Sequence, residues 1–163
     1  MEWTPTTHGQ AADIAKLTVK TFGTEGLFAD IGTGPDLVIA KALQKQGVKG
    51  ITAWDLEETI NKVPIHYPAG IEVVAHDATT TYQRKIDVVL IPFVFSAYGL
   101  LLPTITAQDP VRGGVVYRTT SSYESEFRQA LDPRYKKYEI TEQITNGSPN
   151  IVFKTKSWLD VEK

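Results

Sequence analysis

Short apolar runs alternate with amphipathic stretches along most of this chain. The apolar runs at 26–31, 51–55, 71–75, 86–91 and 114–119 predict five strands. The stretches between them show mainly helical periodicity. Strands that alternate with helices indicate a parallel sheet with helices on both faces. The fourth run is rich in β-branched residues, as parallel strands buried on both faces are.

The helices are predicted from their termini as well as from their periodicity. The first begins with a capping box, in which Thr7 is the N-cap and Gln10 reaches back, and Gly23 ends it. In the second, Pro35 takes the first position and Asp36 lies in the first turn. The predicted helices span residues 7–23, 35–46, 57–62, 96–107 and 123–131.

The last part of the chain has the pattern of a β-hairpin. Strands at 137–145 and 150–155 are joined by the turn sequence Asn-Gly-Ser-Pro at 146–149. We therefore predict an α/β fold: a doubly wound, mostly parallel seven-stranded sheet with helices on both faces and a C-terminal antiparallel hairpin. A length of 163 residues suits one domain, 1–163, with the N-terminal helix preceding a core of 26–163.

Composition narrows the function classes. The formal net charge of −2 argues against a binder that contacts nucleic acid over its whole surface, although a local basic patch is compatible with it. The absence of cysteine excludes disulfides, thiolate metal sites and cysteine nucleophiles. His8, His66 and His76 are far apart in sequence, so no metal site is predicted. No apolar run reaches about 18 residues and no signal pattern opens the chain, so we expect a cytoplasmic protein without membrane contact.

Acidic residues stand where the first three predicted strands end. Asp30 closes the first strand, Asp55 the second and Asp77 the third. The carboxyl ends of parallel strands meet at one edge of a sheet, and ligands bind beyond that edge. We expect these carboxylates and Asp36 to converge on one crevice. Such a crevice suits a ligand that carries a ribose and a positive charge, and it suits a diphosphate badly.

Each residue type at this edge has a chemical use. Gly32 and Gly34 let the backbone approach a ligand and turn sharply into a helix. Asp55 follows Gly34 by 21 residues, a spacing typical of a carboxylate that accepts hydrogen bonds from both ribose hydroxyls. Asp77 is placed to accept the exocyclic amine of an adenine, and Asp30 to face an ammonium group, directly or through water.

The same residues also have purely structural interpretations. The glycine pair fits a tight strand-to-helix turn, Asp36 fits a helix-stabilising acid, and Asp77 fits a helix N-cap. His76 and His8 are more typical of a half-buried histidine and a helix-start residue than of ligands or catalysts.

A dinucleotide site fits this sequence less well. The fingerprint Gly-x-Gly-x-x-Gly would need a glycine where Leu37 stands. Asp36 also places a negative charge where the pyrophosphate would rest on the helix N-terminus. An NAD-dependent oxidoreductase is therefore kept only as the weaker alternative.

These segments together resemble the class I S-adenosylmethionine-dependent methyltransferases. The matching segments are 29–34, 54–55, 76–78 and 86–93, with 113–116 and the hairpin resembling the last three strands of that family. The resemblance implies S-adenosyl-L-methionine as the cofactor. The residues it places around this cofactor are Asp30, Gly32, Thr33, Gly34, Asp55, Leu56, Asp77, Ala78 and Pro92.

The resemblance also implies a mechanism, in-line methyl transfer, in which positioning and exclusion of water supply much of the rate. No general base is assigned, and Phe93, Tyr98 and Tyr123 are the candidates for the acceptor site. Members that methylate amino groups often carry Asn/Asp-Pro-Pro-aromatic after strand four, whereas this chain has Ile91-Pro92-Phe93. This departure and Asp36 motivate an alternative function, a cofactor-binding module without turnover that acts as a regulatory or partner subunit.

The acceptor itself is not identified by the sequence, and it belongs to one of three classes: a small molecule, RNA or a protein. Acceptor specificity in this family usually comes from insertions or added domains, of which this minimal chain shows almost none. We therefore expect an acceptor site that is shallow, shared within a homodimer, or completed by a partner subunit. The loops at 92–97 and 119–123 are expected to border it.

Overall fold

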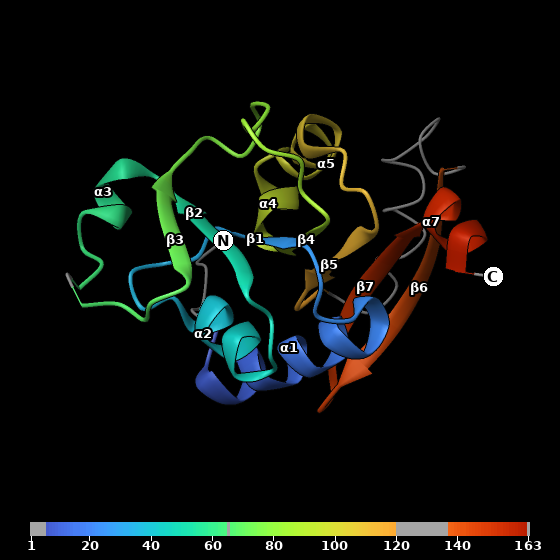
Figure 1. Ribbon diagram of the computed structural model, residues 1–163, viewed down its shortest axis with the longest axis horizontal. Helices are drawn as coiled ribbons and strands as arrows, with labels where there is room; N and C mark the ends of the chain where they lie inside the picture. The colour runs from blue at the N-terminus through green and yellow to red at the C-terminus, as the bar shows by residue number, and fades with distance from the viewer. Residues whose placement is uncertain (1–5, 65, 120–136, 163) are drawn as a thin grey trace.

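A seven-stranded sheet forms the centre of the computed structural model, which describes residues 6–64, 66–119 and 137–162 (Figure 1). The strand order is β3-β2-β1-β4-β5-β7-β6. The first five strands are parallel, and β7 pairs antiparallel with both β5 and β6. The strands are β1 Leu27–Ile31, β2 Gly50–Asp55, β3 Ile71–Ala75, β4 Val88–Pro92, β5 Gly113–Tyr117, β6 Tyr138–Thr145 and β7 Ser148–Thr155. The predicted α/β fold is confirmed.

Helices cover both faces of this sheet. Figure 1 shows α1 and α2 side by side on one face and α4 and α5 on the other. Strand β1 contributes to both cores, since Phe28 packs with the α1 and α2 side while Ala29 and Ile31 pack with the opposite side. The described helices are α1 His8–Phe22, α2 Val38–Lys45, α3 Glu57–Ile60, α4 Val94–Ala97, α5 Leu101–Gln108 and α7 Lys156–Glu162. None of them is long and apolar enough to span a membrane.

The start of α1 is predicted correctly from the sequence, and the start of α2 is not. The capping box of α1 is present, with Gln10 N donating to Thr7 Oγ1 over 3.1 Å. The predicted start of α2 at Pro35 is wrong, because α2 begins at Val38 after Leu37 adopts a left-handed conformation with φ 52°. Asp36 therefore lies in an exposed turn before the helix and not in its first turn.

Two further differences concern helices. The predicted helix 96–107 is two helices, α4 and α5, separated by Gly99 with φ 68°. Helix α7 has no counterpart in the prediction. It packs through Trp158 against Phe22, with ring centroids 5.6 Å apart. The predicted helix 123–131 lies outside the described residues.

Candidate functional site

A pocket of about 180 Å³ opens beyond the carboxyl ends of β1, β2 and β3. The connection that leads from β4 through α4 to α5 closes its other side. Both polar and apolar side chains line it. The lining residues are Ile31, Gly32, Trp54, Asp55, Leu56, His76, Asp77, Ala78, Thr79, Phe95 and Leu100.

The loop between β1 and α2 is tied down by a buried carboxylate. Asp30 is fully buried, and its Oδ2 accepts hydrogen bonds from Thr33 Oγ1 at 2.6 Å and Ala40 N at 3.2 Å. Thr33 N in turn donates to the carbonyl of Trp54 on β2 over 2.9 Å. The second oxygen of Asp30, Oδ1, is buried and has no hydrogen-bond partner among the described residues.

Burial raises the pKa of Asp30 to about 7, since the charged form loses its hydration. The nearby negative charge of Asp55 raises it further, while the hydrogen bonds from Thr33 and Ala40 act in the opposite direction. Asp30 therefore changes its charge near neutral pH, directly beneath the loop that borders the pocket.

Gly32 lies where the chain approaches the opposite wall most closely. Its φ is 69°, and a Cβ atom added there would lie 3.3 Å from Phe95 Cε1 and from Pro92 Cγ. Gly34 also has a positive φ, 71°, but nothing lies within 4 Å of an added Cβ. A positive φ therefore favours glycine at both positions, and position 32 has in addition a tight contact that a side chain would have to displace.

Asp55 is held in place by two backbone donors. Gly34 N donates to Oδ2 over 2.9 Å, and Leu56 N donates to Oδ1 over 2.7 Å. The carboxylate is half-buried at the pocket wall, and each oxygen keeps a lone pair for a further donor. Leu56 follows with 62% of its surface exposed, beside the carboxylate.

Asp77 forms a small turn at the end of β3. Its Oδ1 accepts from Thr79 N at 3.0 Å and from Thr79 Oγ1 at 2.7 Å. These bonds hold the pKa of Asp77 below its ordinary value, so the carboxylate stays ionised. No helix follows, so the structural interpretation of Asp77 as a helix N-cap is wrong.

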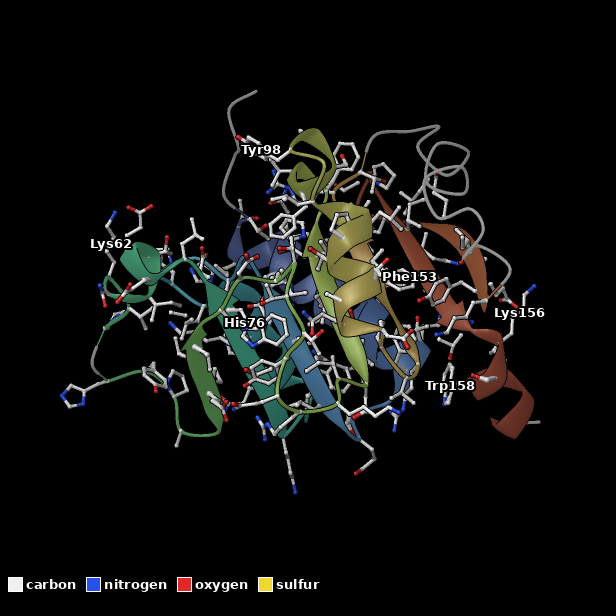
Figure 2. The ribbon with its side chains drawn as sticks, turned by 90° about the horizontal axis from the view of Figure 1, so that it is seen from above. Lys62, His76, Tyr98, Phe153, Lys156 and Trp158 are labelled. Atoms are coloured by element: carbon white, nitrogen blue, oxygen red, sulfur yellow. The ribbon has the colours of Figure 1, made fainter. Side chains whose placement is uncertain are left out.

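From the sequence His76 is interpreted as a half-buried histidine, and it is half-buried; its place in the pocket lining beside Asp77 is not predicted. Its ring lies edge-on to Trp54 at 4.6 Å and to Tyr82 at 5.1 Å between centroids. Figure 2 shows His76 lying over the strands of the sheet. Its Nε2 lies 3.1 Å from the carbonyl oxygen of Thr80. The only signal in the sequence was its place next to Asp77.

Five of the nine predicted cofactor residues line the pocket, and the other four lie outside its lining. Gly32, Asp55, Leu56, Asp77 and Ala78 line the pocket. Asp30, Thr33, Gly34 and Pro92 lie outside the lining, and three of them approach it: Thr33 through Trp54, Gly34 through Asp55 and Pro92 through Gly32. Asp36, which was expected in the same crevice, is exposed and is not part of the lining.

The three acceptor candidates have different positions. Phe93 is half-buried and packs against the core on the α4 and α5 side. Tyr98 ends α4 with 65% of its surface exposed, at the outer rim of the molecule in Figure 2. Tyr123 lies outside the described residues.

Comparison with solved structures finds methyltransferases. Mitomycin 7-O-methyltransferase MmcR superposes with a TM-score of 0.66 at 18% identity, over 91% of this chain and 53% of that one. Human N-acetylserotonin methyltransferase in complex with SAM gives 0.65 at 16% identity, over 92% and 52%. A putative S-adenosyl-L-methionine-dependent methyltransferase from Methanococcus maripaludis gives 0.69 at 16% identity, over 96% of both chains.

Sequence comparison finds no matching family model and no matching curated protein. This chain spans about half the length of the first two structures and nearly all of the third. The fold of this chain is therefore the class I methyltransferase fold, with the sheet order and the antiparallel β5-β7-β6 pairing described above.

Proposed function

We propose that this chain binds S-adenosylmethionine and is a methyltransferase. The observation that carries the proposal is the placement of Asp55 and Asp77, from two neighbouring strands, in one pocket beside the glycine loop of β1. This is the edge at which ligands bind in such sheets. Among the structural neighbours, human N-acetylserotonin methyltransferase is in complex with SAM and the Methanococcus maripaludis protein is a putative S-adenosyl-L-methionine-dependent methyltransferase, which supports the same cofactor here.

The chemistry of the lining fits this cofactor. Two carboxylates, Asp55 and Asp77, face the pocket, and its lining includes no lysine or arginine among the described residues. A ligand with a sulfonium and an ammonium group is favoured there, and a diphosphate is repelled. Leu56, Ala78 and Leu100 provide apolar surface for a planar base.

In this proposal the residues of the chain bind the cofactor and orient it. Asp55 accepts the two ribose hydroxyls with the lone pairs that Gly34 N and Leu56 N leave free. Asp77 accepts the base amine through Oδ2, which receives no hydrogen bond within the described part of the chain. S-adenosylmethionine, when bound, supplies an activated methyl group that leaves by in-line displacement. Phe95 and Leu100 keep water from the pocket, which favours transfer without a dedicated base.

One observation favours a second candidate, a cofactor-binding module without turnover. Strand β4 is followed by Phe93, Val94 and Phe95, which place no acid, amide or histidine at its carboxyl end. Amino groups that lose a proton on methylation would find no acceptor in this segment. Ser96 supplies the nearest hydroxyl along the chain, and Tyr98 the nearest phenolic one.

Calorimetric titration with S-adenosylhomocysteine tests the cofactor. We expect binding by the native chain, and an affinity lower by about 10- to 100-fold in Asp55→Ala, since a hydrogen-bonded charged partner contributes about 1.5–3 kcal/mol. Asp36→Ala is the matched control, because it removes an exposed acid from the neighbouring turn. Equal affinities in the two variants would remove Asp55 from the site, and binding of NAD in place of the nucleoside would overturn the proposal.

Transfer of labelled methyl from S-adenosylmethionine to a cell extract separates the two candidates. Label in an acceptor fraction that disappears in Asp55→Ala supports the methyltransferase. Nucleoside binding without transfer to RNA, protein or small-molecule fractions supports the binding module. Fractionation of the labelled product also identifies the acceptor class.

A further inference from the structure

A second groove lies between α1, α2 and the loop that precedes β3. Its volume is about 280 Å³, and it shares no lining residue with the pocket described above. Figure 1 shows α1 and α2 packed side by side, which forms its two long walls. Pro68 forms part of the third wall, and the adjacent loop is fixed to α2 by Gln44 Nε2, which donates to the carbonyl of Ala69 over 2.6 Å.

The electrostatic character of this groove is opposite to that of the acidic pocket. Lys41, Lys45 and His8 line it, together with the carboxamides of Gln44 and Gln46, and no acid is among the lining residues. The acid nearest in sequence to its α1 wall, Asp13, is instead bonded to Asn146 Nδ2 of the β6–β7 turn at 2.5 Å. Among the polar side chains that line the groove, Lys41 and Lys45 are cations, while the others, Gln44, Gln46 and His8, both donate and accept hydrogen bonds.

The two lysines repel one another without compensation. They are four residues apart on α2, so they lie on the same face one turn apart, where like charges destabilise a helix. Neither lysine forms an ion pair with a described residue. Lys41 is half-buried and lines the groove, as expected of a lysine whose apolar stem packs while its ammonium stays in water. An anion between the two ammonium groups would relieve this repulsion.

We propose that this groove binds the phosphate groups of an anionic ligand. The two lysines are separated by about 6 Å along the helix axis, from the rise of 1.5 Å per residue. A ligand with linked phosphates carries enough negative charge to neutralise both ammonium groups, whereas a single carboxylate carries only one charge. The ammonium groups bind phosphate as point charges, and the carboxamide of Gln46 adds a neutral donor. The site is independent of the cofactor pocket, and a polynucleotide or a small diphosphate could supply the ligand.

Two probes test the proposal on the full chain. Fluorescence anisotropy measures binding of a labelled single-stranded RNA of about 20 nucleotides, and calorimetry measures binding of inorganic diphosphate. The test variant is Lys41→Gln/Lys45→Gln. The matched control is Lys16→Gln/Lys20→Gln, which removes two exposed lysines at the same spacing on α1, outside the groove. Both variants change the net charge equally, and thermal unfolding checks that each is folded.

We expect the groove variant to weaken the binding of at least one probe by about tenfold or more, while the control changes it by about twofold or less. With RNA, loss of two phosphate contacts lowers the slope of log K against log salt by about 1.4. Binding of RNA alone identifies a polynucleotide, and binding of diphosphate alone identifies a small ligand. Equal losses in the two variants, or no binding of either probe at about 50 mM salt, would overturn the proposal.

Discussion

The two walls of the acidic pocket are built differently. The wall from β1, β2 and β3 holds its carboxylates by backbone hydrogen bonds, as Gly34 N and Leu56 N hold Asp55. The wall from α4 to α5 is apolar, with Phe95 and Leu100 facing the pocket and Tyr98 exposed beyond it. The first wall fixes donors and acceptors for a ligand, while the second offers shape alone. Substitutions in the first wall should therefore change the affinity for the cofactor. Those in the second wall should change the rate of methyl transfer to the acceptor.

The largest effect is expected at Asp30, beneath the first wall. Its folded pKa of about 7 lies above the ordinary value of 3.8, so the folded chain keeps a proton that the unfolded chain releases. The stability contributed by this protonated carboxyl is therefore lost as pH rises from about 4 to about 7, by up to about 4 kcal/mol at about 1.4 kcal/mol per pKa unit. In Asp30→Asn this loss should be absent, which urea unfolding across that pH range measures.

Asp36→Asn serves as the control for this experiment, because Asp36 is an exposed acid of the same loop. Its unfolding free energy should follow that of the native chain over the whole pH range. If the unfolding free energy of Asp30→Asn also changes with pH as that of the native chain does, burial does not raise the pKa of Asp30. The first wall would then contain no carboxyl that titrates near neutral pH.

Crowding between the two walls is tested at the glycines. Gly32→Ala adds a methyl group against Phe95 and Pro92 at a positive φ, so we expect about 1–3 kcal/mol of destabilisation and weaker S-adenosylhomocysteine binding. Gly34→Ala meets the same backbone restriction in open space, so it should cost less stability. Thermal unfolding and calorimetry of both variants separate the effect of the contact with Phe95 and Pro92, which only position 32 has, from the effect of the positive φ, which both positions share. Equal losses would show that the close approach at Gly32 is unimportant.

The smallest effect on binding is expected at Tyr98. Because its ring is largely exposed, Tyr98→Ala should change stability by no more than about 0.5 kcal/mol and leave S-adenosylhomocysteine affinity within about twofold. Labelled methyl transfer should fall by about tenfold or more if the ring contacts the acceptor. Tyr67→Ala, an exposed tyrosine of the loop before β3, is the control. Unchanged transfer in Tyr98→Ala would exclude this ring from the acceptor site.

The sequence predicts the strands of this molecule well because apolar runs and turn residues act locally. It fails at the start of α2, where long-range hydrogen bonds from Thr33 N and Gly34 N to β2 hold the loop and Leu37 turns left-handed. The same bonds leave Asp36 outside the pocket. The place of His76 in the pocket lining could not be predicted, because its environment is made by Trp54 and Tyr82, which approach it only in the folded sheet.

The place of β7 in the sheet has a consequence for synthesis on the ribosome. Strand β7 separates β5 from β6, although it is made after both of them. Until residues 148–155 leave the exit tunnel, the free edge of β5 has no neighbour on that side, and the apolar side chains of Ile151, Val152 and Phe153 are missing from the core. A nascent chain that pauses before this point exposes a sheet edge open to pairing with another polypeptide. We therefore expect slow translation through this stretch to lower the fraction of chains that reach the native state.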